Sequence, residues 1–240
     1  MPSKFHFFSK MLCLLTIETS TTVCSVTLSV DNVPVFDRIE TADASHAARL
    51  GIFVSDAVNY ARKNGLTIDA VAVSAGPGSY TGLRIGVSEA KGLCYGFDIP
   101  LIAIPTLKIL ATQMLHHTSD SSFLLCPMID ARRMEVYAAL YDAHLNEIRP
   151  VQADIVNENS YREYLEKRPV VFAGSGSDKC KKIIQSPNAV FLSTIYPTSQ
   201  AMIPLANEAF ARREFVNTAY FEPYYLKEFQ TTVAKSKVLG

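Results

Sequence analysis

The chain lacks an excess of charge of either sign. Among its 240 residues, 23 are lysine or arginine and 23 are aspartate or glutamate, so the formal net charge is zero. Proteins that bind nucleic acid or a membrane surface by themselves usually carry a basic surplus, because phosphate groups attract lysine and arginine. The composition therefore excludes a free-standing nucleic-acid binder and gives no global electrostatic bias toward a membrane. Any such contact is expected to be local or to come through a partner.

The sequence also lacks the cysteine spacings of a disulfide framework or a zinc site. It has five cysteines, an odd number, and none of them forms a C-x-x-C pair. Most lie inside apolar stretches, which is typical of reduced core thiols in a cytosolic protein. We therefore expect a cytoplasmic protein without disulfide bonds or structural zinc. Its cysteines are Cys13, Cys24, Cys94, Cys126 and Cys180.

A membrane-spanning segment is missing as well, because no apolar stretch approaches the roughly 20 residues that such a helix needs. The first apolar stretch, Met11–Ile17, ends at Glu18 without a small-residue cleavage site, so it is not typical of a signal peptide. Met11 stands immediately before the first expected strand. Residues 1–10, which are aromatic and basic, are therefore expected to form an N-terminal extension that the fold does not need.

The most informative segment is Ala72–Gly86, in which an apolar strand meets a Gly-Pro-Gly turn and then a helix rich in small residues. Gly76 and Gly78 allow backbone angles that side chains disfavour, and they leave amides at residues 79–83 where an anion can bind. A tight strand-to-helix connection without a ligand explains the same glycines. Ser79 is interpreted as the helix cap, because the Gly-x-Ser-x-Gly spacing of a nucleophile elbow is absent.

Alternating and periodic apolar patterns predict one α/β lobe in the first half of the chain. Two strands joined by a hydroxyl-rich turn open this lobe, and three strands are expected before the first helix. The expected elements are strands within 12–30, a strand at 33–40, a helix from 43–45 to about 64, a strand at 70–75, the glycine-rich helix, a strand at 100–104 and a helix to about 116.

The opening of the chain is repeated past residue 120. Ile17–Leu28 aligns with Ile129–Leu140, which places an acidic residue, Glu18 or Asp130, at the end of the first strand of each copy. The second copy continues with a strand at 169–173, a Gly-Ser-Gly turn, a lysine-rich helix to about 185 and a helix at about 199–214. We therefore predict an N-terminal lobe, 11–108, and a C-terminal lobe, 109–240. Whether the C-terminal segment returns to the first lobe is left open.

Two α/β lobes with an acidic hairpin turn in each resemble the actin-like ATPase and sugar-kinase superfamily, whose RNase H-like lobes contain mixed sheets flanked by helices. In that superfamily an acid and glycines in both turns hold metal and phosphates between the lobes. Residues 19–22 and 131–134 contain no glycine here, so side chains occupy the space that backbone amides need near phosphate. Nucleotide binding is expected to be weak or lost. The candidate vestigial nucleotide or anion site comprises Glu18, Thr19, Ser20, Gly76, Gly78, Ser79, Asp130, Arg132, Gly174 and Gly176.

Four strings of the chain, in order, resemble those of the TsaB (YeaZ) family: Leu15–Ser20, Ala75–Gly86, Ile129–Tyr137 and Glu222–Leu226. The likeness covers nearly all of the chain after residue 10, and the Gly-Pro-Gly-Ser-Tyr-Thr-Gly-Leu-Arg string is highly specific in combination. The resemblance implies an inactive member of the superfamily that binds its catalytic paralogue TsaD and, through it, the ATPase TsaE. These proteins form N6-threonylcarbamoyladenosine at position 37 of tRNAs that read codons starting with A.

The resemblance therefore implies a supporting subunit that reaches tRNA only through the complex and contacts no membrane. It implies no required cofactor and leaves open a weak or interface-bound ATP or ADP with magnesium.

The histidines agree with a non-catalytic subunit. A metal-binding pair on one helix needs histidines at i and i+4, so that both imidazoles share a face. His46 begins an expected helix without a histidine four residues later, and His116 and His117 are adjacent. We expect no metal site and no catalytic residue. The alternative function is an ATP-dependent phosphotransferase that uses Glu18 and Asp130.

The partner surface is expected on two helices, at about 45–64 and 82–97. Their small residues are more numerous than packing within one lobe requires, and such faces let helices of two subunits approach closely. A homodimer through the same face would compete with the heterodimer, because the surface would be self-complementary. The alternative is that these residues pack the helices on their own sheet. The candidate partner-binding residues are Ala47, Ala48, Gly51, Gly82, Gly86 and Ala90.

Overall fold

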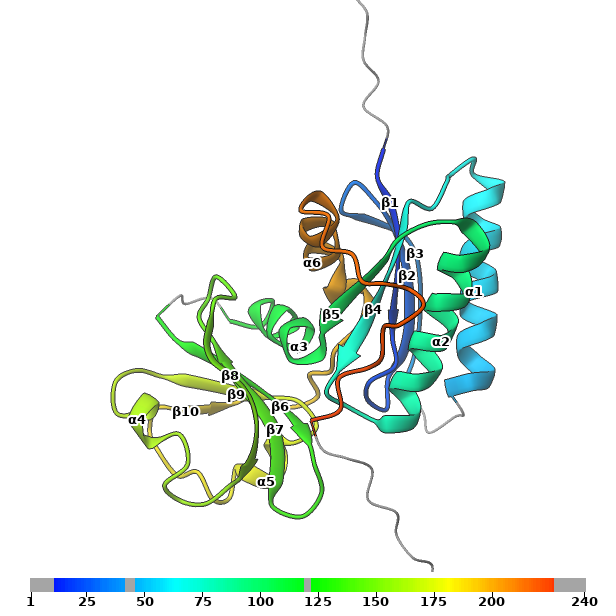
Figure 1. Ribbon diagram of the computed structural model, residues 1–240. Helices are drawn as coiled ribbons and strands as arrows, with labels where there is room; N and C mark the ends of the chain where they lie inside the picture. The colour runs from blue at the N-terminus through cyan, green and yellow to red at the C-terminus, as the bar shows by residue number, and fades with distance from the viewer. Residues whose placement is uncertain (1–10, 42–45, 119–121, 227–240) are drawn as a thin grey trace, which may run out of the picture.

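The computed structural model describes residues 11–41, 46–118 and 122–226 of the chain. The expected N-terminal extension, 1–10, and the expected start of the first helix, 43–45, lie outside these ranges. The described chain forms two lobes, each built on a five-stranded mixed sheet with flanking helices (Figure 1). The predicted α/β fold class is confirmed. Among the described residues, no helix has both the length and the apolar character needed to cross a membrane.

The first sheet comprises β1 (Cys13–Glu18), β2 (Cys24–Val30), β3 (Val33–Glu40), β4 (Ala70–Gly76) and β5 (Leu101–Pro105), and its helices are α1 (His46–Lys63), α2 (Tyr80–Phe97), α3 (Thr106–Leu115) and α6 (Ser199–Ala211). The strand order is β3-β2-β1-β4-β5, with β1 antiparallel to β2 and parallel to β4. Successive β1 side chains point to opposite faces. Leu15 and Ile17 therefore pack against α1 and α2, whereas Leu14 packs against α3 and α6.

The second sheet repeats this arrangement. It comprises β6 (Leu124–Asp130), β7 (Glu135–Tyr141), β8 (Glu147–Ile155), β9 (Val170–Ala173) and β10 (Ala189–Phe191), in the order β10-β9-β6-β7-β8. β6 is antiparallel to β7 and parallel to β9, as β1 is to β2 and β4. The corner after the inner parallel strand is also repeated, because Gly76 has a φ of 104° and Gly174 a φ of 105°. The predicted relation between the two hairpins is thus present in three dimensions.

The second lobe differs from the prediction in its smaller elements. The prediction of a lysine-rich helix that reaches residue 185 is wrong, because α5 spans only Ser177–Cys180 and turns follow it. That turn places Ile184 beside Cys180 in the second core. Strand β8 was not expected, and neither were β10 and the short helix α4 (Arg162–Leu165). β8 is an edge strand that contains Pro150 and has many exposed residues, so it gives a weak apolar signal.

The chain returns to the first lobe at α6, on the side of the sheet opposite α1 and α2 (Figure 1). The Thr16 hydroxyl donates a hydrogen bond of 2.9 Å to the Ser199 carbonyl, and the Ser199 amide donates one of 2.9 Å to Ser25 Oγ. Residues of the expected C-terminal lobe, 109–240, therefore complete the N-terminal one. Helix α3 lies between the two sheets, since Ile109 packs with the first and Leu110 with the second.

All five cysteines are buried free thiols, as expected from their apolar surroundings. Burial raises the pKa of Cys24, Cys94 and Cys180 to about 11. These thiols are therefore protonated and poorly reactive at neutral pH.

Helix α2 lies against the end of β1 without space for side chains between them. A Cβ atom at Gly82 would overlap the Thr19 carbonyl oxygen, and a Cβ atom at Gly86 would overlap Thr19 Oγ1. The Thr19 hydroxyl also donates a hydrogen bond of 2.8 Å to the Gly82 carbonyl. Ala90, one turn further along α2, is fully buried.

The assignment of Gly82, Gly86 and Ala90 to a partner surface is therefore wrong. Their small side chains let α2 approach its own sheet, which was the alternative interpretation. Residues Ala47, Ala48 and Gly51 on α1 are exposed and stay candidates for partner contact.

We expect Gly86→Ala to lower the free energy of unfolding by about 1–3 kcal/mol, because the added methyl group must push α2 away from Thr19. Urea unfolding followed by circular dichroism measures the change. Gly92→Ala is the matched control, since a Cβ atom there meets nothing within 4 Å. Replacing this exposed helical glycine should raise stability by about 0.5–1 kcal/mol. Equal midpoints for both variants would contradict the close packing of α2.

Candidate functional site

Backbone groups of the first acidic turn form hydrogen bonds with Glu18 and with the start of α2. Glu18, at the carboxyl end of β1, is followed by Thr19 and Ser20, and all three are fully buried. The Ser20 amide donates a hydrogen bond of 2.6 Å to Glu18 Oε1, and the Ser20 carbonyl accepts one of 2.7 Å from the Ser79 amide. The turn thus contacts the start of α2 directly, with no gap in which a ligand could separate them.

The N-terminus of α2 uses several of its amides inside the protein. Ser79 Oγ accepts a hydrogen bond of 3.2 Å from the Gly82 amide, so the prediction that Ser79 caps the helix is confirmed. The Leu83 amide bonds to the Ser79 carbonyl at 2.9 Å, and the Ser79 amide bonds to Ser20. Three of the amides at 79–83, where the sequence allowed either a bound anion or a tight connection without a ligand, therefore have protein acceptors. This favours the connection without a ligand.

The Glu18 carboxyl group lies in a polar pocket of the core. Glu18 Oε2, Ser20 Oγ and Ser74 Oγ are all buried, and none completes a hydrogen bond within the described structure. Burial raises the pKa of Glu18 above its ordinary value of 4.5, against the lowering effect of the adjacent Ser20 and Ser74 groups. The surroundings therefore favour the protonated carboxyl group, which is a poor ligand for a cation.

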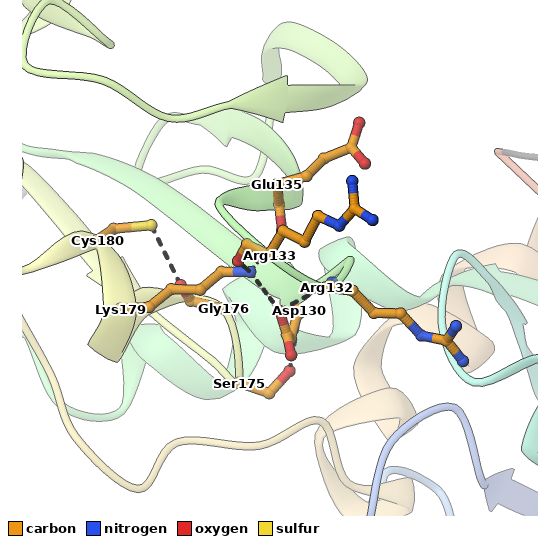
Figure 2. Close-up of polar contacts among 8 residues, drawn as sticks. All are labelled: Asp130, Arg132, Arg133, Glu135, Ser175, Gly176, Lys179 and Cys180. Carbon is orange, nitrogen blue, oxygen red and sulfur yellow. Dashed lines mark hydrogen bonds and ion pairs between the residues drawn. The ribbon is translucent and has the colours of Figure 1, made fainter.

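The second acidic turn holds a lysine beside its carboxylate (Figure 2). The Asp130 side chain is about half exposed and forms an ion pair with Lys179. Lys179 Nζ also donates hydrogen bonds of 2.8 Å to the Arg133 carbonyl and 2.6 Å to the Glu135 carbonyl. The Asp130 amide donates one of 3.1 Å to Ser175 Oγ. The ammonium group thus has three acceptors in this turn and neutralises Asp130.

Two arginines form the tip of the same turn. Arg132 and Arg133 have φ angles of 71° and 48°, which non-glycine residues seldom adopt. The Arg132 amide donates a hydrogen bond of 3.1 Å to Asp130 Oδ1, which supports this conformation. Both side chains are exposed and extend away from the ion pair of Asp130 and Lys179 in different directions (Figure 2). Arg132 therefore does not converge with Asp130 on a common site.

The glycines of the predicted site lie against protein atoms. A Cβ atom at Gly76 would lie 2.5 Å from the Tyr224 carbonyl oxygen, and one at Gly176 would lie 2.9 Å from Val136 Cγ1. At Gly78 and Gly174, a Cβ atom would overlap the carbonyl oxygens of Ser20 and Met128. Close packing of one segment on another accounts for all four positions.

The ten predicted site residues thus fall into two groups. Glu18, Thr19, Ser20, Gly78 and Ser79 contact one another in the first lobe, where Gly76 ends β4. Asp130, Arg132, Gly174 and Gly176 belong to the end of β6 and its neighbours. Among the described residues, no hydrogen bond or ion pair joins Glu18 to Asp130, and no cluster of three or more His, Cys, Asp or Glu residues is arranged to hold a metal ion. Sequence reasoning missed Lys179, because a lysine in a short helix carries no distinctive pattern.

The exposed sides of α1 and α2 form a groove of about 400 Å³. Apolar and charged residues both contribute to it, and Arg84 and Glu89 form no ion pair in the described part of the chain. Gly51 lies one helical turn after Ala47, on the same stripe of α1. Ile52 is 54% exposed and Tyr95 is 89% exposed, which is a high fraction for apolar and aromatic side chains. The groove is lined by Ala47, Leu50, Arg84, Ile85, Ser88 and Glu89.

The chain is similar to proteins of tRNA modification. A family model described as "TsaD: tRNA N6-adenosine threonylcarbamoyltransferase" matches residues 39–235. The tRNA threonylcarbamoyladenosine biosynthesis protein TsaB of Escherichia coli K12 is 30% identical over 236 residues, which cover 95% of this chain and 98% of that protein. The TsaB protein of Bacillus subtilis 168 is 31% identical over 179 residues, or 72% of this chain and 76% of that protein.

The solved structure of YeaZ from Pseudomonas aeruginosa matches with a TM-score of 0.77 and 28% sequence identity, covering 90% of this chain and all of that one. The similarity therefore extends over both lobes.

We expect Glu18→Gln to be more stable than the wild type at pH 8 and to lose this advantage as the pH falls toward 5. The pKa of Glu18 is raised in the folded protein, so folding favours the protonated carboxyl group. The stability that Glu18 contributes is therefore complete below about pH 4.5 and is lost as the pH rises through the pKa of the folded protein. Glutamine keeps the acceptor for the Ser20 amide and carries no charge. Thermal melts of both proteins between pH 5 and 8 measure the difference in stability. If the stabilities of the two proteins changed with pH in the same way, the raised pKa of Glu18 would be contradicted.

Lys179→Met should lower the free energy of unfolding by about 1–3 kcal/mol, because Asp130 and two carbonyl groups lose their donor. Lys181→Met is the control, since Lys181 is exposed and its side chain makes no ion pair in the described structure. Chemical denaturation of the two variants gives the comparison. The same midpoint in both would show that the lysine does not hold the turn.

Proposed function

Because the chain belongs to the TsaB family of tRNA threonylcarbamoyladenosine biosynthesis proteins, we propose that it is a non-catalytic, activating subunit of the modifying complex. In this role it binds the catalytic paralogue TsaD and, through TsaD, the ATPase TsaE. The complex forms N6-threonylcarbamoyladenosine at position 37 of tRNAs that read codons starting with A. The subunit itself meets tRNA only within that complex.

The observation that carries this proposal is the state of the two acidic residues. A phosphotransferase of this superfamily needs both turns open to a metal-nucleotide, with carboxylates free to bind the metal. Glu18 is fully buried with a raised pKa, and Asp130 is paired with Lys179. Neither residue fits a magnesium-nucleotide in this arrangement, so the proposed role requires no nucleotide at these turns.

The surface proposed for TsaD is the groove between α1 and α2. Ala47, Ala48 and Gly51 are exposed and small, so a helix of another subunit can approach α1 closely. Arg84 and Glu89 offer charges of both signs, which favour one orientation of a charged partner. A second copy of the chain on the same face would compete with TsaD, because a two-fold contact uses one patch on both molecules.

Activity measurements separate this proposal from the phosphotransferase alternative. The purified protein should neither hydrolyse ATP nor transfer a phosphoryl or threonylcarbamoyl group, whereas addition of TsaD and TsaE should restore modification of tRNA. Turnover by the protein alone that disappears in Glu18→Ala or Asp130→Ala would establish the alternative.

Gly51→Leu should abolish binding to TsaD and self-association while leaving the fold intact. The reason is that a Cβ atom at Gly51 meets nothing within 4 Å, so the leucine projects from the surface into the space of the partner. Size-exclusion chromatography with mass measurement, of the protein alone and mixed with TsaD, reports both associations. Ala211→Leu is the matched control, because Ala211 is exposed at the end of α6 on the other side of the sheet. Normal complex formation by the Gly51 variant would place the interface elsewhere.

A further inference from the structure

The C-terminal strap, residues 214–226, crosses the first lobe after α6. In Figure 1 it runs from α6 across the first sheet to the region of α2 and ends near the junction of the two lobes. Its Val216 and Phe221 side chains pack against the core beneath α1 and α2. The strap therefore joins the face that α6 covers to the face that carries the groove.

Backbone hydrogen bonds fix the course of the strap. The Val216 amide donates one of 2.9 Å to the Leu101 carbonyl, and the Tyr224 amide donates one of 2.7 Å to the Ala75 carbonyl at the end of β4. Between these points, Lys91 of α2 donates bonds of 3.0 Å to the Ala219 carbonyl and 3.1 Å to the Phe221 carbonyl. Four hydrogen bonds from three elements thus set the position of the residue that follows, Tyr225.

Tyr225 connects the strap to the groove through two side chains of α2. Its ring centroid lies 4.8 Å from that of Tyr80, with an angle of 37° between the ring planes. The Tyr80 hydroxyl accepts a hydrogen bond of 2.8 Å from Arg84 Nη1, and the Arg84 guanidinium carbon lies 5.3 Å from the centroid of the Tyr80 ring. Arg84 in turn lines the groove between α1 and α2. The strap therefore determines where Tyr80 holds Arg84.

An exposed arginine normally samples many rotamers, and fixing it on binding costs about 1.5–2 kcal/mol. The contacts with Tyr80 reduce that freedom before a partner arrives, which lowers the cost of binding. Arg84 uses one hydrogen-bond donor on Tyr80, while its planar group has five. Since no carboxylate of the described chain pairs with Arg84, the remaining donors can meet a carboxylate from outside, to which a guanidinium binds in a two-bond geometry.

We propose that Tyr225 is a positioning residue for the partner surface. It holds Tyr80, and Tyr80 holds Arg84 at the edge of the groove, where Arg84 binds a carboxylate on a helix of the catalytic paralogue. This inference rests on the proposed function, because it assumes that the groove is the surface that meets the paralogue. Beyond that function, the inference identifies Tyr225 as the residue that positions Arg84 and a carboxylate as the group that Arg84 binds.

The test compares Tyr225→Ala with Tyr220→Ala, a strap tyrosine that is 83% exposed. Isothermal titration calorimetry measures the affinity of each full-length variant for the paralogue, and thermal melts report its fold. Tyr225→Ala should weaken binding about tenfold, within the range of common coupling effects, and Tyr220→Ala should leave binding unchanged. Tyr225→Phe should bind like the wild type, because the ring rather than the hydroxyl group packs on Tyr80.

A double-mutant cycle separates positioning from general stabilisation. Arg84→Ala should weaken binding as Tyr225→Ala does, and the double variant should lose no more than either single variant. Additive losses would overturn the proposal, because Tyr225 would then act without Arg84. Tyr80→Phe keeps the ring and removes only the acceptor for Arg84. It therefore tests the positioning of Arg84 even if Tyr225→Ala is unfolded.

Wild-type affinity of the Tyr80→Phe variant for the paralogue would also overturn the proposal. If instead the wild-type protein did not bind the paralogue, the proposed function would be refuted.

Discussion

The packing of α2 against the end of β1 leaves no space for a side chain at Gly82 or Gly86, and this contact determines much of the first lobe. Thr19 donates a hydrogen bond to the Gly82 carbonyl and Ser20 accepts one from the Ser79 amide, so the β1 turn is joined directly to the helix. The position of α2 then decides which of its residues face outward and form a groove with α1. It also places Lys91 where it holds the C-terminal strap.

The two lobes share a topology but close their acidic turns by different means. In the first lobe the carboxyl group of Glu18 is withdrawn into the core, where burial disfavours its charge. In the second lobe Asp130 stays near the surface and Lys179 neutralises it. Neither arrangement leaves a charged carboxylate free to bind a metal-nucleotide, and this supports the proposal of a subunit that works through contact surfaces and not through nucleotide chemistry.

Much of the fold could be predicted from the sequence, because the signals are local. Alternation of apolar residues indicated the hairpins, and the alignment of the strings around Glu18 and Asp130 indicated two related lobes. The cap at Ser79 followed from hydroxyl chemistry at a helix start. Strand β8 could not be found in this way, since its edge position leaves many of its residues exposed. The lysine-rich helix ended early because Ile184 turns into the second core.

The sequence by itself determined the order of the strands and helices in the first half of the chain, the equivalence of the two acidic turns and the lack of glycine in them. Only the tertiary structure decided what each small residue does. A glycine has no side chain, so its spacing along α2 predicts a closely packed face without saying whether a partner or Thr19 lies against it. The same limit applies to Lys179 and Tyr225. Their roles depend on acceptors and rings that lie 49 and 145 residues away in sequence, at Asp130 and Tyr80, and only the folded chain brings these groups together.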